Sequence, residues 1–291
     1  MPEQNSAEVR LLQPDDLAAL YEARYLIYSQ IFKEYMTWAP QDKARFNDTI
    51  DTDLRISAGA FVEGQLACFV NMGSGQHQGQ RTAYNSLTGT LPGYRGQGLA
   101  QQVFEVVVQQ VKSLGYQQMV LEVMPGNLSA LALYRKAGFT RSRAVESYTL
   151  TQPDAYQPEA ASPAYGMVMS ELPHWELLQQ WQNRPPAWQN RQEAIERGYR
   201  NVGCIKVYFK GQLAGQAVYY PTTGTIAQIA TEVNSPNAVV YGHLLDGVRQ
   251  HALNKKLQLY HIDATDEPLT NTLKNKGFTR NATFLELTAK V

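Results

Sequence analysis

The residues best suited to chemistry lie in a glycine-rich turn between a predicted strand and a predicted helix. The turn and its flanks read Thr88-Gly89-Thr90-Leu91-Pro92-Gly93-Tyr94-Arg95-Gly96-Gln97-Gly98-Leu99-Ala100. Residues 83–90 have strand character, and apolar residues recur at three- and four-residue spacing over 99–114, which predicts an amphipathic helix. The N-terminus of a helix leaves backbone N–H groups unpaired and carries partial positive charge, and glycines remove the Cβ atoms that would keep a large anion away. The turn is therefore expected to bind an anion such as a pyrophosphate.

The pattern differs from two better-known phosphate-binding loops. No Lys-Ser or Lys-Thr follows the last glycine, which excludes a P-loop, and the spacing does not give G-x-G-x-x-G. What remains is Arg95-x-x-Gly98-x-Ala100. A predicted strand over 118–124 follows, and then a short helix that Asn127 caps, that contains Leu133-Tyr134 and that Gly138-Phe139 closes.

These two segments, in this order and spacing, resemble the two signatures of the GNAT acetyltransferases. The resemblance implies that acetyl-CoA is the cosubstrate and that an acceptor amine attacks its thioester directly, without a covalent enzyme intermediate. It also implies that the strands on either side of the turn splay apart at their ends. Pantetheine would then lie in the gap and pair with exposed backbone.

The resemblance also implies roles for individual residues. Tyr134 occupies the position of the proton donor to the departing sulfur. Glu122 is the nearest candidate for a general base, because the strand over 84–90 contains no carboxylate. Deprotonation through water without a dedicated base stays open, as does a purely structural role for either side chain. The residues expected to bind the cosubstrate are Thr88, Thr90, Leu91, Arg95, Gly96, Gln97, Gly98, Leu99, Ala100 and Asn127.

Composition limits the class of protein. A length of 291 residues favours two domains, and Lys plus Arg equals Asp plus Glu at 26 each, which argues against a nucleic-acid or anionic-membrane partner. The chain has only two cysteines, Cys68 and Cys204, far apart in sequence, which favours a reducing compartment. No apolar stretch has membrane-spanning length, the N-terminus lacks the order of a signal peptide, and the histidines have no ligand-like neighbours. We therefore expect a cytoplasmic protein without a metal.

The second half of the chain repeats the first. Lys210-Gly211-Gln212-Leu213-Ala214 matches Glu63-Gly64-Gln65-Leu66-Ala67, and the order of predicted strands and helices between 225 and 277 matches that around the glycine turn. The second copy has Glu232 and Pro236 where the first has its turn, so it is expected to have kept the scaffold and lost the cosubstrate. The sequence thus predicts an α/β (α+β) protein with two tandem GNAT-like domains, each a mixed, mostly antiparallel twisted sheet flanked by helices. The predicted ranges are 1–151 for the acetyltransferase domain, 152–165 for a Pro-rich linker and 166–291 for the degenerate domain.

Two further segments carry expectations. A helix after Pro14 places aromatic residues on one face, which either packs on the sheet or walls the acceptor pocket. These residues are Tyr21, Tyr25, Tyr28, Phe32 and Tyr35. The polar, glycine-rich residues 73–80 are expected to form an exposed loop in which His77 is solvated.

The most favoured function is an N-acetyltransferase for a small-molecule amine, with a peptide amine less favoured, acting as a monomer or homodimer. The alternative is a noncatalytic acyl-CoA-binding module whose second half contacts a partner. The presence of both Tyr134 and a complete glycine turn favours the enzyme.

Overall fold

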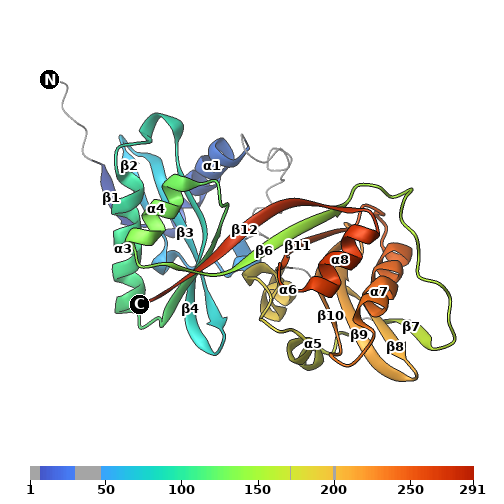
Figure 1. Ribbon diagram of the computed structural model, residues 1–291. Coiled ribbons are helices and arrows are strands. Elements are labelled where there is room, and N and C mark those ends of the chain that lie inside the picture. The colour runs from blue at the N-terminus through green and yellow to red at the C-terminus, as the bar shows by residue number, and fades with distance from the viewer. Residues whose placement is uncertain (1–6, 30–46, 171, 199–200) are drawn as a thin grey trace. The chain divides into compact units, whose positions relative to one another are not determined.

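The computed structural model describes residues 7–29, 47–170, 172–198 and 201–291, which fold into two compact units (Figure 1). Unit 1 comprises Met1–Ser142 and Glu286–Val291, and unit 2 comprises Arg143–Leu285. Each unit contains a mixed, mostly antiparallel sheet with helices, which confirms the predicted fold class. The chain passes from unit 1 to unit 2 within one strand, before the predicted linker at 152–165, whose residues all belong to unit 2.

Unit 1 is built on a sheet in which neighbouring strands follow the order β1-β2-β3-β4-β5, and the end of β12 lies next to β5. Only the contact between β4 and β5 in this series is parallel; β1 to β4 are antiparallel. The elements are β1 (Glu8–Leu11), η1 (Pro14–Asp16), α1 (Leu17–Tyr28), η3 (Leu54–Ile56), β2 (Ala58–Val62), β3 (Gln65–His77), β4 (Gln80–Thr90), η4 (Pro92–Tyr94), α3 (Leu99–Ser113), β5 (Gln118–Val123), α4 (Leu128–Lys136), the start of β6 (Thr140–Leu150) and the end of β12 (Phe278–Lys290).

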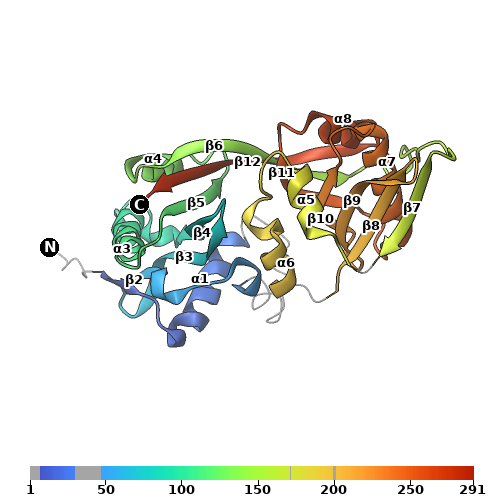
Figure 2. The same ribbon diagram turned by 90° about the horizontal axis from the view of Figure 1, so that it is seen from below.

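Helices cover both faces of this sheet. Helix α3 follows the glycine turn as predicted, and its apolar residues at three- and four-residue spacing are buried. They are Leu99, Val103, Phe104, Val107 and Val111. Figures 1 and 2 show α3 and α4 on one side of the sheet and α1 on the other.

Unit 2 repeats this plan, with the strand order β7-β8-β9-β10-β11-β6 and β12 next to β6. The contact between β10 and β11 is parallel and those between β7, β8, β9 and β10 are antiparallel. Its own elements are β7 (Tyr165–Ser170), α5 (Trp175–Trp181), η5 (Trp188–Asn190), α6 (Gln192–Gly198), β8 (Gly203–Phe209), β9 (Gln212–Tyr220), β10 (Thr225–Thr231), α7 (Asn237–His251), β11 (Gln258–Asp263) and α8 (Glu267–Asn275).

The predicted repeat has a conformational counterpart in two hairpin turns. Glu63 and Gly64 have φ angles of 50° and 79°, and Lys210 and Gly211 have φ angles of 50° and 81°. Positive φ at both central residues is the geometry of a two-residue hairpin whose twist matches that of its strands. The matching sequences therefore form matching turns.

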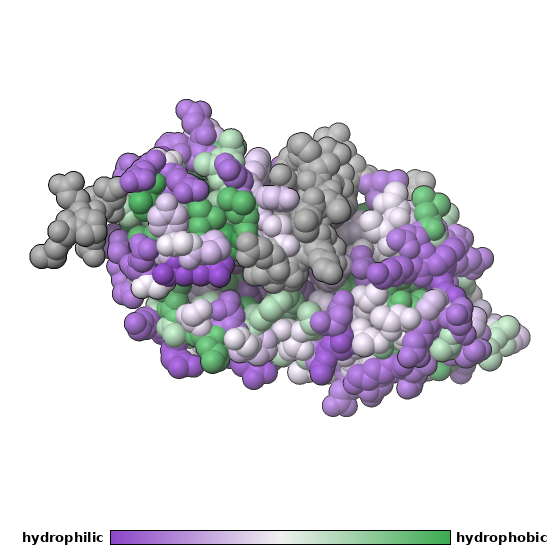
Figure 3. Space-filling model, turned by 90° about the horizontal axis from the view of Figure 1, so that it is seen from above, coloured by the Kyte–Doolittle hydropathy of each residue, from purple (hydrophilic) through white to green (hydrophobic). Residues whose placement is uncertain are grey.

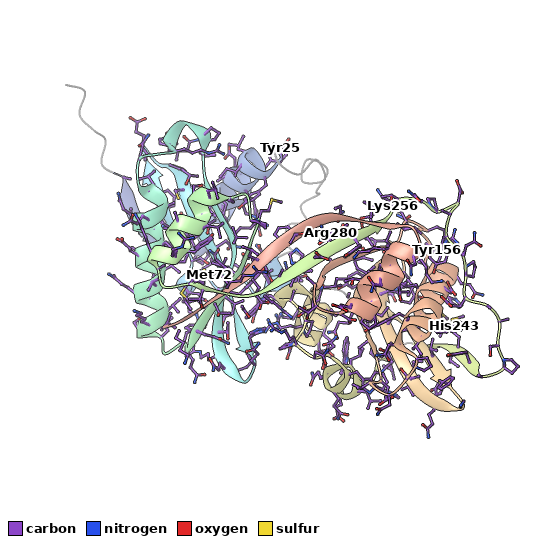
Figure 4. All side chains as sticks on the ribbon, viewed as in Figure 1. Tyr25, Met72, Tyr156, His243, Lys256 and Arg280 are labelled. Atoms are coloured by element: carbon purple, nitrogen blue, oxygen red, sulfur yellow. The ribbon has the colours of Figure 1, made fainter. Side chains whose placement is uncertain are left out.

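The proline-rich segment 152–164 contains no helix or strand, but it packs closely on unit 2. Tyr156 is buried against α7 and α8 (Figure 4), and its hydroxyl donates to Asp246 Oδ1 at 2.6 Å. Lys276, at the end of α8, lies 3.0 Å from Glu159 and 3.2 Å from Asp246. A buried lysine held by two carboxylates fixes this segment, because leaving either charge unpaired in the interior is costly.

The aromatic face predicted on the first helix is not the buried face of α1. Leu20, Ala23, Arg24 and Ile27 are buried instead, whereas Tyr25 is 37% exposed. Tyr25 points outward (Figure 4). On the face of the molecule drawn in Figure 3, hydrophobic and hydrophilic residues are mixed. The helix turns its smaller aliphatic side chains to the sheet, where Ile27 packs closely over Gly89. Phe32 and Tyr35 lie outside the described residues.

The prediction of an exposed loop at residues 73–80 is wrong. β3 continues to His77, only Gln78 and Gly79 form the turn, and β4 begins at Gln80. His77 is only 4% exposed, so it is not a solvated loop residue. Glycine content suggested a loop, but Gly73 is needed for close approach: a Cβ there would lie 2.0 Å from Ile50 O.

Candidate functional site

In unit 1, β4 and β5 separate partway along β4, and the space between their diverging ends is here called the cleft. Their parallel ladder runs from Thr82↔Gln118 to Asn85↔Leu121, whereas β4 continues to Thr90 along β3. Beside the last pair, Ser86 is an extra residue, because Met72 pairs with Asn85 and Asn71 pairs with Leu87. A bulge of this kind bends a strand and increases its twist. The strands therefore splay at the position that the sequence predicted.

Beyond the bulge, alternate residues of β4 face opposite edges. Leu91 N–H donates to Ala67 O of β3, so the backbone groups of Thr88 and Thr90 face the cleft. The Tyr28 hydroxyl donates to Thr88 O at 2.8 Å, and Arg95 Nε donates to Thr90 O at 3.1 Å. Thr88 and Thr90 thus turn backbone groups toward the cleft, whereas the Leu91 N–H is used within the sheet.

The glycine turn leaves open space in front of the first turn of α3. Gly96 and Gly98 have φ angles of 78° and 79°, which side chains with a Cβ rarely adopt. A Cβ at Gly96 would meet nothing within 4 Å, and one at Gly98 would meet only Gln102 Nε2 at 4.0 Å. Gly98 O accepts from Gln101 N and Gln102 N, so the N–H groups of Leu99 and Ala100 precede the first helical hydrogen bonds. The turn therefore leaves open space beside the positive end of a helix, where an anion would be favoured.

Tyr134 projects from α4 to the point of the splay. Its ring packs against Phe104 and Phe139, with centroids 5.5 Å and 5.7 Å away, and the residue is 6% exposed. Asn85 Nδ2 donates to Tyr134 Oη at 3.2 Å. Burial raises the pKa of Tyr134 above its ordinary value, while hydrogen bonds with Thr88 and Asn85 act in the lowering direction. The phenol is therefore protonated at neutral pH.

Glu122 lies on the other side of the sheet from Tyr134. Successive side chains of a strand point to opposite faces, so Asn85 and Leu121 share the face of Tyr134, while Tyr84 and Glu122 share the opposite one. The Tyr84 hydroxyl donates to Glu122 Oε2 in a short contact. The structure therefore places the candidate base and the candidate acid on opposite faces of the sheet, at the same splay.

Sequence reasoning missed two residues at this cleft, Tyr84 and Asn85, whereas Tyr28 belongs to the aromatic face that was considered for the acceptor pocket. The strand over 84–90 contains no carboxylate. Its functional candidates are the phenol of Tyr84 and the amide of Asn85, which lie on opposite faces of the sheet. Their signal was a pair of polar-tipped side chains immediately before the bulge, but the bulge itself depends on pairing with β3. Asn127 caps α4, since its side chain accepts from Ala130 N at 3.2 Å.

The equivalent place in unit 2 is differently filled. β10 and β11 pair only at Thr225↔Gln258 and Ile226↔Leu259. Gln228 Nε2 donates to Asn190 O, and Asn190 Nδ2 donates to Tyr260 O, both at 2.6 Å, so a loop spans the gap between these strands. The remaining cavity has a volume of about 190 Å³. That is below the roughly 300–1,000 Å³ usual for sites that enclose a cofactor-sized ligand.

In the turn before α7, a carboxylate of the chain itself accepts a backbone hydrogen bond. Glu232 Oε2 accepts from Asn234 N at 2.9 Å, and Pro236 stands at the N-cap. A carboxylate from the chain thus occupies a backbone donor that the glycine turn of unit 1 leaves to a ligand.

Within the described residues, no group of three His, Cys, Asp or Glu side chains is arranged to hold a metal ion. None of the described helices has the length and apolar character that crossing a bilayer requires.

Comparison with known proteins agrees with this geometry. The sequence model of the Acetyltransferase (GNAT) family matches residues 17–139. The N-alpha-acetyltransferase MAK3 of Arabidopsis thaliana is 28% identical over 98 residues, which are 34% of this chain and 52% of that protein. The chain spans about half the length of the curated relatives it matches.

Solved structures share the fold across both units. A putative acetyltransferase from Pyrococcus horikoshii has a TM-score of 0.68 at 14% identity, covering 100% of this chain and 91% of that one. A tandem GNAT protein from the clavulanic acid biosynthesis pathway has a TM-score of 0.66 at 14% identity, covering 98% of each chain. Residues 17–139 of this chain therefore belong to a GNAT acetyltransferase domain, and the chain shares its fold with a tandem GNAT protein.

Proposed function

We propose that this chain is an N-acetyltransferase that moves the acetyl group of acetyl-CoA directly to a primary amine in the cleft of unit 1. The observation that carries the proposal is the splay of β4 and β5, with the protonated Tyr134 hydroxyl at its point and an open glycine turn at its mouth. GNAT domains use acetyl-CoA, and the splayed strands and the open turn offer backbone groups that could bind it.

Each part of the cosubstrate has a suitable counterpart in unit 1. The N–H groups of the turn and of the first residues of α3 would bind the pyrophosphate, with Arg95 adding positive charge. The cleft-facing backbone of Thr88 and Thr90 would pair with pantetheine amides once the Arg95 side chain leaves Thr90 O. Arg95 is exposed, so this movement has little steric cost.

Bound acetyl-CoA supplies an acetyl thioester whose carbonyl carbon is open to attack by an amine. In the proposed reaction the nitrogen–carbon bond forms and the carbon–sulfur bond breaks. Tyr134 donates its proton to the departing sulfur, and the amine releases a proton to Glu122, directly or through water. Because these two groups lie on opposite faces of the sheet, cosubstrate and acceptor would meet at the splay from opposite sides.

The acceptor is proposed to be a small-molecule amine, and the second candidate is the α-amine of a peptide. The names of the curated relatives, which are N-alpha-acetyltransferases, favour the peptide. A screen should measure release of free CoA thiol with amines, polyamines, amino acids and short peptides of varied first residue. A polyamine or amino acid that turns over at least tenfold faster than every peptide supports the first candidate, and the reverse ranking supports the second. Release of CoA with none of them, despite binding of acetyl-CoA, favours the noncatalytic acyl-CoA-binding module.

Substitution of Gly98 tests the binding site directly. Gly98→Glu places a Cβ at a φ of 79° and a negative charge at the turn, so we expect the affinity for acetyl-CoA to fall at least tenfold. Gly98→Gln introduces the same backbone strain without the charge, so its affinity for acetyl-CoA should fall less than that of Gly98→Glu. Isothermal titration of the parent should give one acetyl-CoA per chain, because the turn in unit 2 already holds Glu232. Two equivalent sites would contradict this assignment.

A further inference from the structure

The amide of Asn85 lies at the point of the β4–β5 splay, in contact with the candidate proton donor. Asn85 is 4% exposed and forms the last pair of the parallel ladder, opposite Leu121. Its Nδ2 lies 3.2 Å from Tyr134 Oη and 2.9 Å from Thr88 Oγ1, and its Oδ1 accepts from Thr88 Oγ1 at 3.1 Å. The Asn85 amide is therefore buried, and its hydrogen bonds are made with protein groups rather than with water.

The direction of the hydrogen bond determines where the Tyr134 proton can point. An amide nitrogen only donates, so the phenol oxygen is the acceptor in this contact. The phenol proton then points away from the Asn85 amide, and the ring cannot swing away because Phe104 and Phe139 flank it. An acceptor at position 85 would have the opposite effect, since it would bind the proton itself.

The same contact favours the charge that the reaction produces. As the phenol gives up its proton, negative charge develops on Oη, and an N–H already aimed at that oxygen stabilises it. Asn85 is therefore suited to assist the transfer without contacting the reacting carbon or sulfur.

We propose that Asn85 is a positioning residue, which orients the Tyr134 hydroxyl so that its proton points into the cleft and which stabilises the phenolate formed on transfer. This inference rests on the proposed function, because it requires Tyr134 to be the donor. Thr88 supports the arrangement, because its hydroxyl contacts both ends of the Asn85 amide and limits the movement of this side chain.

Two substitutions at Asn85 test the inference. Asn85→Leu keeps the approximate volume and removes the donor, so kcat should fall about tenfold while the acetyl-CoA dissociation constant changes by less than about threefold. Asn85→Asp replaces the donor with an acceptor, so its kcat at neutral pH should fall further than that of Asn85→Leu. Its activity relative to the parent should rise as pH falls from about 8 to about 6, because a protonated carboxyl again has an O–H to donate. A merely structural role predicts no such recovery.

A double-mutant cycle shows whether Asn85 acts through Tyr134. In a Tyr134→Phe background, Asn85→Leu should have little further effect on kcat, because the group it orients is absent. Thr88→Val removes a hydroxyl that contacts both Asn85 and Tyr134, so it should also lower kcat, and this loss should likewise disappear in the Tyr134→Phe background. This variant serves as the test if the Asn85 variants do not fold.

Three results overturn the inference. They are unchanged kcat in both Asn85 variants, an undiminished tenfold loss in the Tyr134→Phe background, and an Asn85→Asp variant whose relative activity does not depend on pH. Full activity of Tyr134→Phe alone is a different failure, because it removes the proposed donor role and the Asn85 inference falls with it.

Discussion

Replacing Tyr134 with phenylalanine should lower kcat by about a hundredfold, because the departing sulfur then has no positioned proton donor. General acid catalysis contributes on this scale, which corresponds to about 3 kcal/mol in the barrier. The ring and its contacts with Phe104 and Phe139 are retained, so packing should survive. The acetyl-CoA dissociation constant should change by less than about threefold, since the lost contact matters mainly in the transition state.

A second buried tyrosine of unit 1 provides the matched control. Tyr116 is 3% exposed and its hydroxyl lies 2.8 Å from Ser74 Oγ, outside the cleft. Tyr116→Phe removes the same atom and should leave kcat within about twofold of the parent. Steady-state rates of CoA release and isothermal titration of acetyl-CoA provide the two measurements. An active Tyr134→Phe variant would mean that Tyr134 only packs in the core.

The sign of the pH dependence follows from the raised pKa of Tyr134. A donor must be protonated, and burial keeps this phenol protonated above its ordinary range, so it does not limit kcat as pH rises through neutrality. A loss of activity on the acid side would then report protonation of the base that accepts the amine proton, or of the amine itself.

The helices and strands around the turn could be predicted because their signals are local. The turn, α3, β5 and the Asn127 cap of α4 all follow from short spacings in the sequence. The relation between Tyr134 and Glu122 could not be predicted in the same way. It depends on the register of β4 against β5, since a shift of one residue would bring Glu122 to the other face.

The pairing of strands that lie far apart in the sequence could not be predicted either. The repeat predicted two tandem domains, the first of which was expected to comprise residues 1–151. In the structure, residues 145–149 of β6 pair with β11 in unit 2, and Glu286–Val291 belong to unit 1. Local alternation of apolar and polar residues is the same for either partner, so it cannot distinguish them.

This arrangement makes the last residues of the chain part of the proposed active unit. The end of β12 lies next to β5, Leu287 and Ala289 are each 5% exposed, and Val291 N–H donates to Gln117 O at 3.3 Å. β5 carries Glu122 and leads directly into α4, which carries Tyr134. Removing Glu286–Val291 would leave β5 as an unpaired edge with apolar surface exposed to water.

Deletion of Glu286–Val291 should therefore abolish acetyl-CoA binding and CoA release, although no residue proposed for the chemistry is removed. Amide hydrogen exchange should increase in β5 and α4, whereas amides of α7, which lies wholly in unit 2, should keep their protection. Removal of Val291 alone is the matched control, since it costs one backbone hydrogen bond, about 1 kcal/mol, and should leave activity nearly unchanged. A protein lacking 286–291 that binds acetyl-CoA like the parent would show that β5 holds its position without this neighbour.

The same reasoning predicts that a fragment ending near residue 152 is inactive, because it too lacks the strand that completes unit 1.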